Sequence, residues 1–120
     1  MPESRKGAGG LRHIVDATRY SIAGLHAALG EAAFRLELLA AAVLIPAACY
    51  ATRSGVERAL LIGSVLLVLI IELLNSAVEA AVDRVSTEVH PLAKRAKDLG
   101  SAAVMLSLGN AAVVWLLVLL

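Results

Sequence analysis

Polar side chains recur on one face of an otherwise apolar stretch, residues 72–83, and this stretch limits the possible folds more than any other part of the chain. At about 100° per residue, four of them fall within an arc of about 80° on one side of a helix. We call them the polar row: Glu72, Asn75, Glu79 and Asp83. The other positions are mostly Leu, Ala and Val. A solvated amphipathic helix is the simplest interpretation, but the apolar run upstream favours a membrane span.

Composition also favours a membrane. Hydrophobic residues make up 59% of the 120 residues, and aromatic residues make up 3%. A soluble domain this small buries only about two-thirds of its surface, so much of this apolar content would face water. Ionisable side chains inside a bilayer cost roughly 2.5–3.5 kcal/mol each and usually face a bundle interior or a wet cavity. The polar row is therefore a candidate for a functional site.

Other features exclude several classes of protein. The single cysteine, Cys49, excludes an intrachain disulfide and a cysteine-built zinc site. A net charge of +1 and the lack of a basic stripe with interleaved aromatics argue against a nucleic-acid partner. We also expect no cleaved signal peptide, because the start of the chain is polar and rich in glycine.

We expect an all-α membrane protein of one domain, in which three transmembrane helices follow an amphipathic surface helix. Residues 52–55 form a polar turn that is too short for anything but an antiparallel helix pair. Pro91 should end or interrupt a helix near His90. The expected segments are a disordered tail at 1–10, the surface helix at 11–29, and spans at 34–52, 56–84 and 95–120.

The second span determines the depth of the polar row. Residues 56–83 would form a helix of about 42 Å, longer than a hydrocarbon core of about 30 Å. A helix centred in the bilayer would bury Glu72 deeply, whereas a span that ends near Glu72 lets the row emerge at the interface. We favour the second placement because it avoids most of the insertion cost. It requires a cover for Leu73, Leu74 and Val78, which the 11–29 helix could provide.

Basic residues predict the orientation. Lysine and arginine number five through Arg35, two in residues 52–58 and four in residues 83–98. With three spans, the first and third groups share a side, and the positive-inside rule places that side in the cytoplasm. The N-terminus and the polar row are then cytoplasmic, and the C-terminus lies outside.

A row of acids near basic residues such as Lys97 combines the groups that phosphoryl transfer requires. Carboxylates hold Mg²⁺, cations neutralise phosphate charge, and an acid orients or deprotonates the attacking hydroxyl. Glu72 and Glu79 would lie about 10.5 Å apart along a helix, too far to share one ion. Asn75 and Glu79 could serve a metal together with Glu31. These residues alone leave a proton-coupled transporter and a non-catalytic assembly subunit open.

Three motifs occur in order along the chain: EAAFRLE at 31–37, ELLNSAVEAAVD at 72–83 and RAKDLGSAAV at 95–104. In these motifs the chain resembles the prokaryotic diacylglycerol kinase family, over roughly residues 11–120. The resemblance implies a homotrimer of three-span subunits in the bacterial inner membrane. It also implies transfer of the γ-phosphoryl group of ATP to diacylglycerol, which yields phosphatidic acid.

The resemblance also implies roles for individual residues. Glu72 matches the general base that acts on the lipid hydroxyl, and Glu31 and Glu79 match the carboxylates linked to Mg²⁺ at the nucleotide. Asn75 and Asp98 match catalytic positions, of which Asp98 also faces the nucleotide. The remaining matches are nucleotide-pocket positions at His13, Tyr20, Glu88, His90 and Lys97, and lipid-facing positions at Ser21, Arg58 and Ser101.

Two features depart from the family pattern. His13 stands where well-known members carry an arginine, which would make a nucleotide contact there weaker or pH-dependent. The spacing from Ser21 to Glu31 is one residue shorter than usual, which would rotate the surface helix by about 100° unless Gly30 absorbs the change. Within this class, an undecaprenol kinase of the same fold is the alternative, although the residues at 75–77 are closer to those of the diacylglycerol kinase branch.

Overall fold

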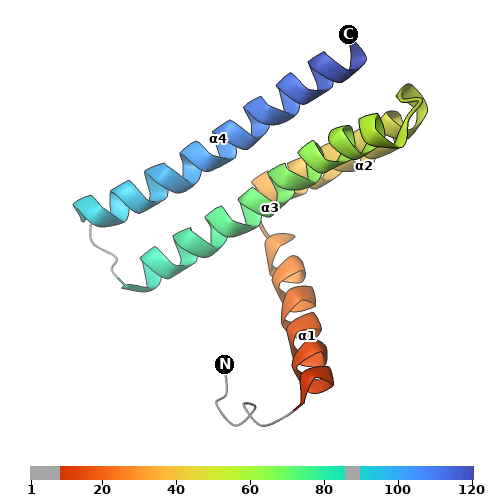
Figure 1. Cartoon of the computed structure of the whole chain (residues 1–120). Helices are drawn as coiled ribbons and strands as arrows, with labels where there is room; N and C mark the ends of the chain where they lie inside the picture. The colour runs from red at the N-terminus through yellow and green to blue at the C-terminus, as the bar shows by residue number, and fades with distance from the viewer. Residues whose placement is uncertain (1–8, 86–89) are drawn as a thin grey trace.

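The computed structural model describes residues 9–85 and 90–120, which form four helices (Figure 1). They are α1 (Gly10–Ala28), α2 (Ala32–Ala51), α3 (Gly55–Val85) and α4 (Pro91–Leu119). Within these described ranges, α2, α3 and α4 are long and apolar enough to cross a membrane. The expected all-α fold, with three candidate spans after an N-terminal helix, is confirmed. Most of the expected disordered tail lies outside the described residues.

The central helix is α3, and both α2 and α4 pack along it (Figure 1). A short turn joins α2 to α3, so the two helices are antiparallel. At this turn, Ser54 Oγ accepts a hydrogen bond from the backbone N–H of Glu57 at 3.1 Å. Glu57 Oε1 in turn accepts a hydrogen bond from the backbone N–H of Arg53 at 3.4 Å. This reciprocal cap resembles a capping box and sets where α3 begins.

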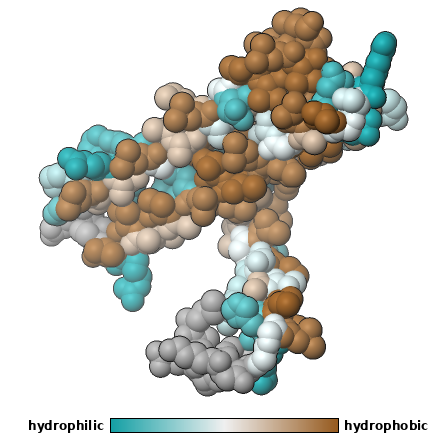
Figure 2. All heavy atoms as spheres, viewed as in Figure 1, coloured by the Kyte–Doolittle hydropathy of each residue, from teal (hydrophilic) through white to brown (hydrophobic). Residues whose placement is uncertain are grey.

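Small and branched apolar side chains make up the core. Its buried members include Ala41 and Ala48 of α2, and Leu61, Val65 and Val68 of α3. Alanine lets helix backbones approach closely, as is usual where membrane helices pack. Most of the other large apolar side chains are exposed, and they cover the outer surface of the helices (Figure 2). Such a surface suits lipid or further protein better than water.

Contacts near both of its ends hold α4 on α3. The Nε1–H of Trp115 donates a hydrogen bond that is shared by the backbone oxygen of Leu61 at 3.3 Å and Ser64 Oγ at 3.2 Å. Towards the other end, Lys97 Nζ forms an ion pair with Asp83 Oδ1 at 2.7 Å. These two contacts define the register of α4 along α3.

The start of α4 shows how Pro91 acts: His90 is extended and lies outside a helix, as expected for the residue before a proline, and a new helix follows. The helix begins at Pro91, in the first turn, where the missing N–H of proline has no helical partner to lose. His90 Nδ1 accepts a hydrogen bond from the backbone N–H of Leu92 at 3.1 Å and so caps this end. Pro91 therefore starts a helix here, and α4 is longer than the expected span at 95–120.

The N-terminal helix α1 extends away from the other three at a steep angle (Figure 1). The expected cover is only partial: Leu74 and Val78 are 58% and 36% exposed, whereas Leu73 is half-buried and lines a groove with residues of α1. The junction with α2 contributes to this direction: Arg35 Nη1 donates a hydrogen bond to the backbone oxygen of Leu29 at 2.9 Å. This bond ties the end of α1 to the first turn of α2, and the apolar stripe of α1 stays exposed.

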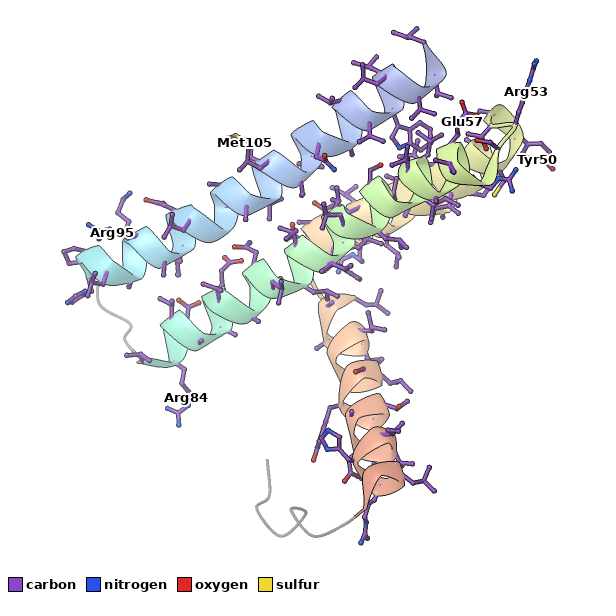
Figure 3. The ribbon with its side chains drawn as sticks, in the orientation of Figure 1. Tyr50, Arg53, Glu57, Arg84, Arg95 and Met105 are labelled. Atoms are coloured by element: carbon purple, nitrogen blue, oxygen red, sulfur yellow. The ribbon has the colours of Figure 1, made fainter. Side chains whose placement is uncertain are left out.

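Charged side chains gather at the two ends of the bundle (Figure 3). Arg53 and Glu57 lie at the α2–α3 turn, whereas Arg84 and Arg95 lie at the opposite end. Met105 lies between the two ends on the outer side of α4 and is exposed. The apolar length between two charged ends is the part that a bilayer would cover.

Candidate active site

The polar row passes from a buried to an exposed position along α3. Glu72 is only 7% exposed. Asn75 is half-buried, and Glu79 and Asp83 are exposed. The first member of the row therefore lies inside the bundle, and the last two reach its charged end. This gradient agrees with the placement in which the row emerges from the membrane near Glu72.

A second carboxyl group faces Glu72. The side chain of Glu37 on α2 lies within hydrogen-bonding reach of the Glu72 carboxyl. Glu37 Oε2 is buried and has no hydrogen-bond partner among the described residues. Two carboxyl groups can form a hydrogen bond only when one of them carries a proton. The two carboxyl groups therefore form a polar pair inside the bundle, between α2 and α3.

Sequence reasoning misses Glu37, because it looks like an ordinary charged residue at the edge of a span. The position of Glu37 relative to the turn does predict that it faces Glu72. Glu37 precedes the end of α2 by 14 residues, about 21 Å, and Glu72 follows the start of α3 by 17 residues, about 26 Å. A short turn between antiparallel helices thus brings the two carboxyl groups to within about one helical turn of each other.

Two polar contacts occupy the exposed part of the row. Asn75 Nδ2 donates a hydrogen bond to Glu79 Oε1 at 3.1 Å, so these residues meet as their spacing predicts. Asp83 Oδ1 pairs with Lys97 Nζ across the α3–α4 interface at 2.7 Å. An amide, two carboxylates and a lysine therefore lie together at the charged end of the bundle.

A second lysine lies on α4 in the same region. Lys94 Nζ pairs with Asp98 Oδ2 at 2.6 Å, one helical turn apart. The side chains of this pair are 71% and 63% exposed. Ion pairs at such exposed positions contribute little and exchange readily with solvent. Both the lysine and the carboxylate are therefore accessible to a phosphate or a nucleotide.

Glu31 lies where the chain turns from α1 into α2. It precedes the first residue of α2 in an extended conformation, and it lines an open groove of about 690 Å³ between α1 and α3. The groove is mostly apolar, and its other polar side chains are Ser21 and Ser76. Because Ser76 follows Asn75 on α3, this groove adjoins the polar row.

The carboxylates of the site suit an Mg²⁺ ion that is bound together with a nucleotide. Carboxylate oxygens such as those of Glu31 and Glu79 are the hard ligands that Mg²⁺ prefers. Within residues 9–85 and 90–120, no three His, Cys, Asp or Glu side chains are grouped to hold a metal ion. Proteins often hold Mg²⁺ with one or two carboxylates, while nucleotide phosphates and water supply the rest. The residues fit a nucleotide-bound ion better than a cage built from protein alone.

Several expected site residues lie apart from this group. Arg58 Nε donates a hydrogen bond to Thr52 Oγ1 at 3.4 Å, at the α2–α3 turn. It is 14 residues, or about 21 Å along α3, from Glu72. His13 and Tyr20 lie on exposed faces of α1. The single chain does not bring these three residues to the polar row.

The remaining expected residues lie on or before α4. His90 caps the helix and lines a small pocket with Val85 and Leu92 near the charged end. Ser101 is exposed, one turn beyond Asp98. Glu88 lies outside the described residues.

Comparison with known proteins decides the family. Residues 19–119 match the family model described as prokaryotic diacylglycerol kinase. The chain belongs to the prokaryotic diacylglycerol kinase family. A diacylglycerol kinase of Pseudomonas aeruginosa is 55% identical over 120 residues, which are 99% of this chain and 98% of the relative. Those of Haemophilus influenzae and Escherichia coli K12 are 49% and 47% identical, over 88% and 92% of this chain and 91% of each relative.

The prokaryotic diacylglycerol kinase match covers the part of the chain that carries the site. It runs from the second half of α1 to the end of α4, and it includes Glu31, Glu37, the polar row and Lys97. His13 lies before its first residue. The resemblance seen in three short motifs is therefore confirmed over nearly the whole chain, and the chain is a multi-pass membrane protein of this family.

Proposed function

We propose that the chain is a lipid kinase that transfers the γ-phosphoryl group of ATP to diacylglycerol and yields phosphatidic acid. One observation carries the proposal: the buried carboxyl group of Glu72 adjoins an exposed set of acids and lysines within a few turns of α3 and α4. A lipid hydroxyl can approach from the apolar side, and a nucleotide can approach from the charged end. Membership of the prokaryotic diacylglycerol kinase family supports the same reaction.

Glu72 is suited to act as the base. Its carboxylate can accept the proton of the diacylglycerol hydroxyl while the hydroxyl oxygen bonds to the γ-phosphorus. The bond from the γ-phosphorus to the bridging oxygen breaks, and ADP leaves. Glu37 can share the proton that Glu72 receives. The apolar groove beside Ser76 supports an acyl-chain site close to this base.

The exposed residues are suited to hold the nucleotide. Lys94 and Lys97 can donate charge-assisted hydrogen bonds to phosphate oxygens when they exchange their carboxylate partners for phosphate. Glu79, oriented by Asn75, and Glu31 would hold Mg²⁺. When bound, the ion supplies neutralisation of the phosphate charge.

The geometry also supports an assembly of several subunits, a homotrimer by the family resemblance, with the polar row at the cytoplasmic face. The row is exposed from Glu79 onward. Three spans alone cannot separate the wet face around Glu72 and Asn75 from lipid, which cannot satisfy polar groups, so a neighbouring subunit is needed to enclose this part of the row. Arg84 and Arg95 lie at the same end as the row (Figure 3), in agreement with a cytoplasmic location.

The test compares two carboxamide substitutions on α3. Glu72→Gln keeps the shape of the side chain but cannot accept the hydroxyl proton, so transfer of radiolabel from Mg·ATP to diacylglycerol in mixed micelles should be abolished. Glu57→Gln makes the same change at the opposite end of the helix and should leave transfer near wild type. Sedimentation of both variants should show an unchanged oligomer.

Three results would contradict parts of the proposal. Transfer that survives in Glu72→Gln would remove Glu72 from the base role. In a mixture of lipids, a preference for undecaprenol over diacylglycerol would assign the acceptor differently, and ATP-independent proton flux in liposomes would favour a transporter.

A further inference from the structure

One contact between α4 and α3 lies beside the polar row and has no part in the mechanism described above. Gly100 of α4 stands directly against the side chain of Asn75 on α3. A Cβ atom at Gly100 would overlap Asn75 Oδ1, and it would lie 3.3 Å from Asn75 Cγ and 3.9 Å from its Cα. A Cβ atom at Gly63 of α3 or at Gly109 of α4 would meet nothing within 4 Å. Among the glycines of residues 9–85 and 90–120, Gly100 is the one at which a Cβ atom would overlap a side chain.

Both ends of the Asn75 carboxamide are constrained. Its Nδ2 donates to Glu79 Oε1 at 3.1 Å, which distinguishes the nitrogen from the oxygen. Its Oδ1 is buried and has no hydrogen-bond partner among the described residues. Buried polar atoms without a partner are uncommon, and each one asks for an explanation. Here the missing side chain at Gly100 leaves room for Oδ1, which allows the amide to present Nδ2 to Glu79.

A methyl group at position 100 could be accommodated in two ways. Rotation of the amide would break one hydrogen bond, between Asn75 and Glu79. Separation of α4 from α3 would loosen contacts along the whole interface, including those of Trp115 and Lys97. The first response disturbs far less of the structure, so the amide should yield before the helix does.

We propose that Gly100 is a positioning residue, which acts through Asn75 to orient Glu79 in the phosphoryl-transfer site. The inference rests on the proposed function, because it gives Asn75 and Glu79 a part in that site. The competing explanation is that Gly100 serves only the close packing of membrane helices. A packing role predicts a loss of stability, whereas a positioning role predicts a moved amide in a folded protein.

The amide can be observed directly. The chain contains two asparagines, Asn75 and Asn110, and no glutamine, so only two side-chain NH₂ pairs occur in a ¹H–¹⁵N correlation spectrum of the micellar protein. Asn75→Ala identifies the Asn75 pair by its loss. Gly100→Ala should shift that pair, and the matched control Gly109→Ala should leave it in place. An Asn75 pair that does not move in Gly100→Ala overturns the proposal, whether or not the protein is a kinase.

Kinetics provide the second readout. Gly100→Ala should lower kcat for transfer from Mg·ATP to diacylglycerol by about 100-fold, the scale expected when a reacting group is displaced by about 1 Å. Its thermal midpoint should match that of Gly109→Ala, which should keep near wild-type kcat. In an Asn75→Ala background, Gly100→Ala should cause no further loss, because both changes act on one amide. An equal loss in both backgrounds would contradict the proposal.

A folding defect would also be informative. If Gly100→Ala cannot be purified as a folded protein, the double variant Gly100→Ala with Asn75→Ala shows where the clash lies. Alanine at position 75 is smaller than asparagine and makes room for the methyl group at position 100. Recovery of folded protein locates the clash at Asn75 and supports the proposal. Continued failure locates it elsewhere in the interface and overturns it.

Discussion

Replacing Trp115 by Phe should weaken the packing of α4 on α3 by about 0.5–1 kcal/mol, because hydrogen bonds between membrane helices contribute about 0.6 kcal/mol on average and at most about 1.7. The indole N–H is one donor shared by two acceptors, at 3.3 Å and 3.2 Å, both longer than the most common length of about 2.9–3.0 Å. Ser64 Oγ also donates to the Leu61 oxygen at 2.8 Å, so the variant leaves neither acceptor without a partner. The loss should therefore stay well below the maximum.

The assay is a double-mutant cycle with Ser64→Ala, in which the free energy of unfolding is measured by titration with a denaturing detergent. A coupling of about 0.5 kcal/mol between Trp115 and Ser64 is expected. Trp115 lies 17 residues, about 26 Å along α4, from Asp98, so phosphoryl transfer should be nearly unchanged. A coupling of zero would show that the indole does not meet Ser64, and it would refute the register of α4 described above.

Two further predictions concern the charged end of the bundle. Lys97→Ala should lower transfer by about 100-fold, in the range found when one donor to a transition-state oxygen is removed. Exchange of the pair, Asp83→Lys with Lys97→Asp, should keep the ion pair and the oligomer but not restore activity. Recovered activity would assign the lysine a structural role. Glu79→Gln should raise the Mg²⁺ concentration for half-maximal activity by at least about tenfold, a loss seen even for residues outside the first metal shell. An unchanged Mg²⁺ dependence would remove Glu79 from metal binding.

The helices and the polar row could be read from the sequence because a bilayer leaves few choices. Long apolar runs must form helices, and the spacing of Glu72, Asn75 and Glu79 then places them on one face. The Asn75–Glu79 hydrogen bond follows from that spacing alone.

Contacts between helices were harder to predict from the sequence, because they depend on the register of one helix along another. Glu37 could have been paired with Glu72 by counting residues from the turn, but the approach of Gly100 to Asn75 requires the register of α4, which Trp115 helps to set. The direction of α1 could not be predicted either. An apolar stripe indicates what a helix contacts, whereas its angle depends on local bonds such as that from Arg35 to Leu29.

The short α2–α3 turn has an evolutionary consequence. The carboxyl groups of Glu37 and Glu72 are aligned by the lengths of the two arms of the hairpin, with no flexible segment to correct an error. One residue gained or lost in either helix would turn its carboxyl group by about 100° and move it by about 1.5 Å along the axis. Amino acids in these arms can be exchanged one for another, but the number of residues from 37 to 72 can change only in compensating steps, and variation in length is left to the rest of the chain.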